Sequence, residues 1–259
     1  MDSNAPKPAL QTCNKLLKKT PKSQIIRVIS AFHAYYRSLT SAIQTLKSLA
    51  LVRSGRIEEA GVQCDEILKE HPIEDDVLSA LTFTLRHLGR HENIVSMYED
   101  AFRRAPHNEE LGVQTFFALV RVGSWKTAQQ VSLKLSKAFP SSSRYFFWSA
   151  TSAYLQACDP TTVPNAKPVL LTLALRMLSQ LPSTYNSLST PDKLYLHLEI
   201  LLSYDEPKLL DAFNLLDSEQ GKSLVQFSLA IEERRREVWL KLSKFAEEKE
   251  LSEKKLSQG

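Results

Sequence analysis

Cysteine is almost absent from this sequence, and it contains no long apolar run. The three cysteines, Cys13, Cys64 and Cys158, lie far apart and form no CxxC pair, so they predict neither a disulfide framework nor a zinc site. No apolar run reaches the roughly 18 residues of a membrane-spanning helix. The start of the sequence, Met1-Asp2-Ser3-Asn4, is polar and acidic overall and lacks the basic and then apolar segments of a signal peptide. We therefore expect a cytoplasmic protein without direct membrane contact.

Motifs for catalysis or cofactor binding are also missing. The six histidines form no HExxH or HxH pattern, and the sequence has no GxSxG and no glycine-rich phosphate loop. His87 and His91 are four residues apart, but Gly89 between them is expected to end a helix, so their rings should not share a helix face. We predict no catalytic, cofactor-binding or metal-binding residue, and no bound cofactor.

Glycine is scarce as well, with seven residues in 259, yet three of the seven recur at a fixed step. These three are 34 residues apart, and three prolines recur with the same step. A 34-residue period of helix-breaking residues is typical of tetratricopeptide arrays, in which each unit is one helical hairpin. Two alanines in the same phase mark places where helices must approach closely. The repeat-defining residues are Gly55, Gly89, Gly123, Pro72, Pro106, Pro140, Ala60 and Ala128.

Residues 41–74 illustrate one unit of the repeat. Apolar residues at helical spacing predict a first helix that stops before Gly55, where a left-handed backbone costs little. A second helix is predicted over residues 57–70, because the residue before Pro72 avoids the helical region. A hairpin cannot cover its own apolar stripe, so neighbouring hairpins must stack. We predict an all-α, tetratricopeptide-type α-solenoid of stacked helical hairpins.

The chain is predicted to begin within a repeat. Residues 1–23 follow the pattern of a second helix, with Ala9, Cys13 and Leu16 at its apolar positions, and we interpret them as a half repeat. Pro21, which closes this pattern, lies 51 residues before Pro72 rather than 34, so 17 residues are extra. We predict that residues 24–40 are an insertion, with a retained intron as a hypothesis for its source.

The remaining parts follow the period until it decays. Residues 41–140 are predicted to hold three 34-residue repeats, residues 141–221 degenerate helical hairpins, and residues 222–259 a long charged helix and tail. Within the degenerate part, helices are predicted at 145–156, 166–181, 194–204 and 207–217, and the long charged helix is predicted to begin at Lys222.

Candidate partner-binding residues come from the repeat position of the cations. First helices line the concave side of tetratricopeptide arrays, and the thirteenth position of successive units is cationic. Such a row could grip an acidic peptide, a carboxylate or a phosphate, whereas the alternative is a solvated face. Aromatic residues at helical spacing favour a core, as at Phe116-Phe117 and Trp125, but two others could instead line a partner surface. The candidates are Arg53, Arg86, His87, Arg121, Tyr145 and Trp148.

The wording of the repeats carries a family resemblance over most of residues 1–217. The stretches that carry it are Ala9-Leu-Gln-Thr-Cys-Asn-Lys-Leu-Leu-Lys-Lys, Leu49-Ala-Leu-Val-Arg-Ser-Gly-Arg, Leu88-Gly-Arg, Met97-Tyr-Glu-Asp-Ala, Pro106-His-Asn-Glu-Glu-Leu and Tyr145-Phe-Phe-Trp-Ser. In this order they resemble the amino-terminal repeats of the auxiliary subunit of N-terminal acetyltransferase B (NatB). Members of that family continue for several hundred residues beyond this chain, and the 17-residue segment is not part of their pattern.

The resemblance implies a non-catalytic scaffold. Its partners would be the catalytic acetyltransferase subunit of NatB, which would bind acetyl-coenzyme A, and the ribosome, with nascent chains beginning Met-Asp, Met-Glu, Met-Asn or Met-Gln as substrates. The formal net charge of +4 is mildly basic, and we expect no sequence-specific nucleic-acid partner. One alternative is a general repeat adaptor that binds peptide tails, and another is an enzyme with a helical-repeat body.

Overall fold

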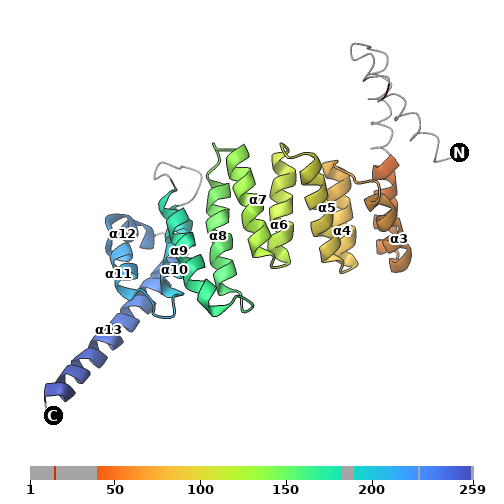
Figure 1. The fold of residues 1–259 in the computed structure, drawn as a ribbon. Coiled ribbons are helices and arrows are strands. Elements are labelled where there is room, and N and C mark those ends of the chain that lie inside the picture. Colours follow the sequence, from red (N-terminus) through yellow and green to blue (C-terminus); the bar gives the residue numbers. More distant parts are fainter. Residues whose placement is uncertain (1–14, 16–39, 182–189, 227, 258–259) are drawn as a thin grey trace. The chain divides into compact units, whose positions relative to one another are not determined.

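A computed structural model describes residues 15, 40–181, 190–226 and 228–257, and the regular structure in these ranges is entirely helical (Figure 1). The predicted half repeat and insertion lie outside the described residues, apart from Lys15 within the half repeat and Thr40 at the end of the insertion. The chain divides into two compact units, Met1–Ala118 and Leu119–Gly259. The all-α prediction is confirmed, because consecutive helices pack in pairs as a tetratricopeptide array requires.

The first unit is built from helical hairpins at the predicted positions. Residues 40–53 are helical and are followed by α3 (Ile57–Leu68), α4 (Asp75–His87), α5 (His91–Arg104) and the larger part of α6 (Glu109–Arg121). α4 packs against α3 on one side and α5 on the other. Its core includes the fully buried side chains of Ile67, Leu78, Leu81 and Leu85.

The three repeat glycines end their helices with one shared geometry. Each has a left-handed backbone, with φ of +77° at Gly55, +69° at Gly89 and +73° at Gly123. The N–H of each glycine donates to the carbonyl oxygen of the residue three positions earlier. The N–H of the residue after the glycine donates to the carbonyl oxygen five positions before that residue, and all six distances are 2.9–3.1 Å. This is a Schellman motif, which satisfies carbonyls that the helix end leaves unpaired. The step of 34 in the sequence is therefore the repeat of one helix-ending motif.

The second unit contains helices that pack closely through small residues. Its helices are α7 (Trp125–Ala138), α8 (Arg144–Cys158), α9 (Lys167–Ser179), α10 (Thr190–Leu202), α11 (Leu209–Asp217), α12 (Glu219–Val225) and α13 (Leu229–Ser257), with the short 3-10 helix η1 (Pro164–Ala166) before α9. α8 packs against both α7 and α9. Ala150 and Ala153 on α8 and Ala174 on α9 are fully buried. Because these side chains are small, the helices can pack closely.

The prediction of a single helix from Lys222 onward is wrong at its start. The structure has α12, which ends at Val225, and a separate α13, which begins at Leu229. The main-chain oxygen of Ser228 accepts the N–H groups of Ile231 and Glu232, both at 3.1 Å, and so starts α13. Serine before an apolar run is a helix-start signal that the prediction overlooked.

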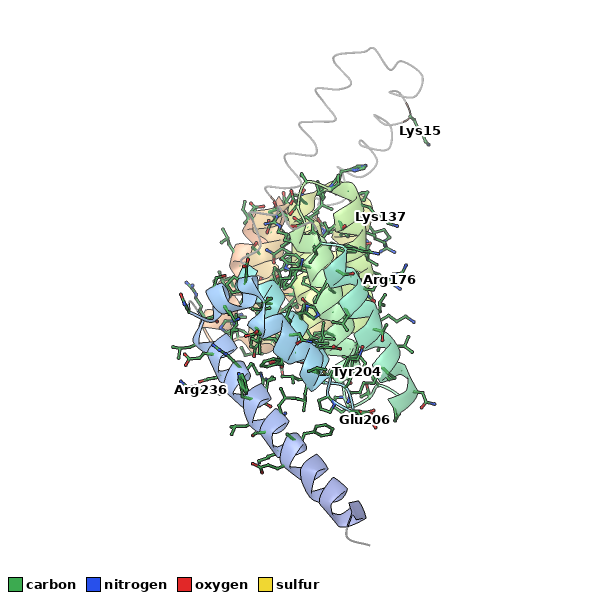
Figure 2. All side chains as sticks on the ribbon, turned by 90° about the vertical axis from the view of Figure 1, so that its left-hand side faces the viewer. Lys15, Lys137, Arg176, Tyr204, Glu206 and Arg236 are labelled. Carbon is green, nitrogen blue, oxygen red and sulfur yellow. The ribbon has the colours of Figure 1, made fainter. Side chains whose placement is uncertain are left out.

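The predicted hairpin before this break is present. α10 and α11 match the helices predicted at 194–204 and 207–217, with α10 beginning earlier, at Thr190. Tyr204 and Glu206 lie in the loop that joins them (Figure 2). The Nζ atom of Lys208 lies 4.4 Å from the centre of the Tyr204 ring, which adds a cation–π contact to this turn.

Candidate interaction surface

In the first unit, exposed cations end the first helix of each repeat. Arg53 lies in the last turn before Gly55, and Arg86 and His87 end α4; all three side chains are exposed. The last turn of a helix carries partial negative charge, so cations stabilise it. Residues 40–53 include no acidic residue, and the acidic residues of α4 lie in its first turn. The carboxy-terminal ends of these helices therefore present positive charge.

His87 is oriented by its own helix. Its Nδ1 lies 2.9 Å from the main-chain oxygen of Phe83, and because that oxygen can only accept, Nδ1 must carry the proton and donate. The two rings also lie together, with centroids 4.2 Å apart. Phe83 itself is 42% exposed. The remaining nitrogen, Nε2, is thus the one that can bind a partner, beside an exposed aromatic ring.

Exposed aromatic residues at this repeat position were not predicted. Phe117 stands 34 residues after Phe83 and is also exposed, whereas its neighbour Phe116 is buried. The prediction that the Phe116-Phe117 pair belongs to the core is therefore correct for the first ring and wrong for the second. The 34-residue spacing of Phe83 and Phe117 was the signal that could have found this pair.

Arg121, the fourth predicted cation, belongs to the second unit. It lies in the last turn of α6, before Gly123, and its side chain is exposed. All four predicted cations are thus accessible to a partner. Their role in binding stays a prediction.

Tyr145 is a correction, because it is a core residue rather than an accessible partner contact. It is 0% exposed, and its ring packs edge-on against Trp148 with centroids 5.3 Å apart. Arg144 covers the same ring, with its Cζ 4.8 Å from the centroid, and donates from Nη2 to the Tyr145 hydroxyl at 2.6 Å. Trp148 is half-buried, so only part of its indole could contact a partner.

Trp125 fills its repeat position and also makes a polar contact. Its side chain is half-buried, and its indole Nε1 donates to Oδ2 of Asp159 at 2.8 Å. The hydroxyl and N–H of Thr161 donate to the other oxygen of Asp159. Hydrogen bonds from Thr161, followed by the one from Trp125, hold the pKa of Asp159 below its usual value. The contact fastens the start of α7 to the loop after α8.

A cleft of about 350 Å³, which no sequence pattern predicted, lies between the end of α3 and α5. His71 Nδ1 lies 2.8 Å from Oδ2 of Asp100, and Arg103 pairs with the other oxygen of that carboxylate. Burial acts to raise the pKa of Asp100, but hydrogen bonds from Arg103 and His71 outweigh it and lower the pKa. Arg104 Nη1 donates to the main-chain oxygen of His71 at 2.5 Å. The group fastens neighbouring repeats together. His71 lies 29 to 33 residues before the other members of the group, which explains why no local motif revealed it.

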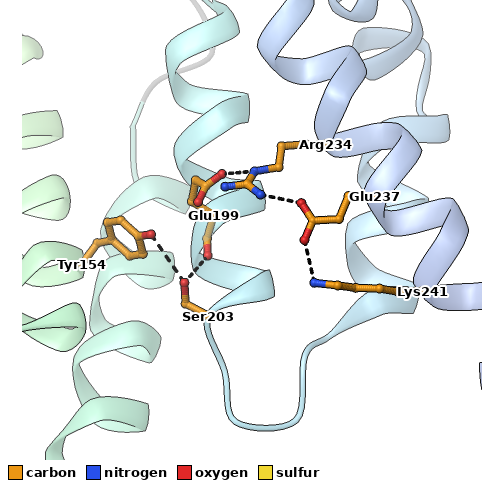
Figure 3. A network of polar contacts seen from close by, with 6 residues as sticks. All are labelled: Tyr154, Glu199, Ser203, Arg234, Glu237 and Lys241. Carbon is orange, nitrogen blue, oxygen red and sulfur yellow. Dashed lines mark hydrogen bonds and ion pairs between the residues drawn. The ribbon is translucent and has the colours of Figure 1, made fainter. Parts of the chain in front are cut away.

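A polar network fastens α13 to α10 and α8 (Figure 3). Arg234 of α13 pairs with Glu199 of α10 and with Glu237 of its own helix, which also accepts from Lys241 Nζ at 2.6 Å. Just after α10, Ser203 Oγ donates to the main-chain oxygen of Glu199 at 2.7 Å, so the Tyr154 hydroxyl of α8 is the donor to Ser203, at 3.5 Å. Burial raises the pKa of Tyr154 to about 12.

Among the residues that the structure describes, no three histidine, cysteine, aspartate or glutamate side chains gather closely enough to hold a metal ion. His87 ends α4 and His91 begins α5, as predicted from the glycine between them. No helix in the described ranges is long and apolar enough to cross a membrane.

Comparison with known proteins decides between the readings of this repeat array. The family model of the Psidin N-terminal TPR repeats region matches residues 1–256. The chain belongs to this family. Its similarity to N-alpha-acetyltransferase 25, NatB auxiliary subunit, of Rattus norvegicus is 30% identity over 258 residues, which is 99% of this chain and 24% of that protein. It is also 32% identical over 213 residues to the Phagocyte signaling-impaired protein of Drosophila pseudoobscura pseudoobscura, covering 82% of this chain and 20% of the relative.

The Psidin-family assignment confirms the resemblance to the NatB auxiliary subunit. A third relative, the N-terminal acetyltransferase B complex subunit NAA25 homolog of Caenorhabditis elegans, is 28% identical over 86% of this chain and 21% of its own length. The chain thus spans about a quarter of the length of these relatives. The fold is also similar to a chain in the solved structure of Naa15/Naa10 bound to HypK-THB, with a TM-score of 0.54, 16% identity, and coverage of 93% of this chain and 32% of that one.

Proposed function

We propose that this chain acts as a non-catalytic scaffold in NatB. In this role it binds the catalytic acetyltransferase subunit and aids association with the ribosome, so that nascent chains beginning Met-Asp, Met-Glu, Met-Asn or Met-Gln are acetylated during synthesis. The observation that carries the proposal is the match of the Psidin family model to residues 1–256, together with relatives named as NatB auxiliary subunits.

The surface chemistry supports a scaffold role. A hairpin array offers exposed side chains along successive helices, which suits the binding of another protein. The cations Arg53, Arg86, His87 and Arg121 and the aromatic side chain of Phe83 are exposed on first helices. On this proposal acetyl-coenzyme A is held by the catalytic partner, in the cytoplasm, and this chain binds neither membrane nor a specific nucleic-acid sequence.

Affinity purification of the full chain from the cells that make it, followed by mass spectrometry, tests the proposal. We expect a small acetyltransferase to be recovered together with ribosomal proteins. Recovery of a chaperone without an acetyltransferase would contradict the proposal and favour a general repeat adaptor.

An activity assay tests the non-catalytic part separately. The purified chain, given acetyl-coenzyme A and a Met-Asp peptide, should transfer no acetyl group, and the same peptide with a blocked amino terminus serves as the control. Addition of the recovered acetyltransferase should produce acetylated peptide. Acetylation by the chain alone, absent from the blocked control, would overturn the non-enzyme assignment.

A further inference from the structure

One face of the helix at residues 40–53 is uncovered although its counterparts in later repeats are buried. Ile43 is 59% exposed, whereas Val77 and Leu111, one and two periods later, are each 1% exposed. Leu46, one turn further along, is 62% exposed, whereas its counterparts Ala80 and Gln114 are half-buried. Burying an isoleucine or leucine side chain stabilises a fold relative to leaving it exposed. The residues of this face are therefore suited to burial.

The uncovered face extends along the whole helix. Ala50 is exposed, whereas Thr84 and Ala118, its counterparts in the next two repeats, are 0% and 3% exposed. Residues spaced by three and four positions lie on one side of an α-helix. Ile43, Leu46 and Ala50 therefore form a single stripe, which we call the uncovered stripe.

In the later repeats of the first unit, the second helix of one repeat covers the first helix of the next. α3 packs against α4. The hydroxyl of Thr115 on α6 donates to the main-chain oxygen of Tyr98 on α5 at 3.1 Å. The start of the helix at residues 40–53 already contacts the turn that follows α3, where Ser41 Oγ donates to Glu70 at 3.3 Å. Among the helices that the structure describes in full, none is the second helix of a preceding repeat that would cover the uncovered stripe.

We propose that residues 6–17 cover the uncovered stripe as that second helix. With the offset of 51 residues between Pro21 and Pro72, they correspond to α3, and their Ala9, Cys13 and Leu16 take the positions of three α3 residues that are 0% exposed, namely Ala60, Cys64 and Ile67. Lys15 is helical and exposed, as is its α3 counterpart Glu66.

The insertion is compatible with this docking. The entropic cost of closing a loop grows slowly with its length, so 17 extra residues between two packed helices are tolerated when they replace no core contact. On this proposal residues 24–40 interrupt the sequence period and leave the stacking of helices intact. The proposal is independent of the function in NatB, because it concerns contacts within one chain.

Hydrogen exchange on the full-length chain tests the docking, with two substitutions matched in exposure. Ile43→Asp places a charge on the uncovered stripe. Val62→Asp places the same charge at a residue that is 62% exposed in the same repeat and whose counterparts, Ser96 and Gln130, are polar and exposed. We expect amides of residues 6–17 to be protected in the wild type and in Val62→Asp, and to exchange at least about tenfold faster in Ile43→Asp.

A reciprocal variant guards against a trivial loss of folding. Cys13→Asp should expose amides of residues 40–53 while leaving α4 and α5 protected. Unprotected amides at residues 6–17 in the wild type, or equal effects of Ile43→Asp and Val62→Asp, would overturn the proposal. A wild-type dimer in sedimentation velocity that Ile43→Asp converts to monomers would also overturn it, because a second copy would then be the occupant.

Discussion

At the residue scale, Gly89 shows why glycine recurs where the helices end. Its φ is +69°, and a Cβ built at this position would meet nothing within 4 Å. Space is therefore available for a side chain, and only the left-handed backbone disfavours one. The glycine is needed for its backbone conformation alone.

We predict that Gly89→Ala lowers the free energy of unfolding by about 1 kcal/mol, because alanine costs about 1–2 kcal/mol in the left-handed region and regains part of this through a less flexible unfolded chain. Gly89→Asn should cost less, since asparagine tolerates this region. Urea denaturation followed by circular dichroism measures both. Equal losses for alanine and asparagine would contradict a purely conformational role.

The same scale separates what sequence could and could not predict. The glycines were predictable because a positive φ is a local requirement that leaves a mark at each helix end. Burial is set by neighbours distant in the chain. Tyr145 was therefore kept as a candidate partner contact although it is 0% exposed, and Phe117 was assigned to the core although it is 37% exposed. The cleft around Asp100 was missed for the same reason.

At the element scale, α13 is attached through one stripe of its surface. Ile231 and Val238 are fully buried in a cluster with α10 and α11, and Arg234 between them pairs with Glu199, which is 15% exposed. Arg236, labelled in Figure 2, pairs with Glu232 of its own helix and is 73% exposed. The two arginines therefore have the same charge on the same helix but different surroundings.

We predict that Arg234→Met weakens the attachment of α13 by about 1–2 kcal/mol, because it leaves the carboxylate of Glu199 with little solvent and no cation. The value is below that of a fully buried pair, since Arg234 is 33% exposed. Arg236→Met should change stability by less than about 0.5 kcal/mol. Hydrogen exchange in α13 measures both, and an equal response to the two substitutions would show that the network carries no special weight.

Helix boundaries show the limits of sequence at this scale. The second helix predicted at residues 57–70 ends at Leu68 in the structure, within two residues of the prediction, because glycine and proline mark the ends of the helices in this unit. After Pro140 these marks fade, and the break between α12 and α13 was missed in the uncharged stretch between Lys222 and Glu232. Where neither glycine nor proline marks the end of a helix, packing against neighbouring helices determines the residue at which it ends.

At the scale of the whole molecule, the fold class followed from one period, but the function did not. Tetratricopeptide hairpins serve many partners, so stacked helices alone are compatible with an adaptor or a subunit of an enzyme complex. The distinguishing information lies in side chains between the glycines and prolines. These make the family match over residues 1–256, and they place exposed cations at the ends of first helices.

Charge reversal at those cations separates a specific surface from general basicity. The double variant Arg53→Glu, Arg121→Glu changes the formal net charge from +4 to 0. The double variant Lys69→Glu, Lys137→Glu makes the same change at exposed cations near the ends of second helices, with Lys137 visible on α7 in Figure 2. Both pairs lie near negative helix ends, so their effects on helix stability should be similar.

We predict that the first pair lowers recovery of the acetyltransferase partner and the second does not. Each lost exposed ion pair is worth about 0.5–1 kcal/mol, so two of them should weaken binding roughly five- to thirtyfold. Titration of the partner at physiological salt measures the dissociation constants. A similar weakening by both pairs, abolished by high salt, would indicate that net charge alone attracts the partner and that the ends of the first helices form no specific contact.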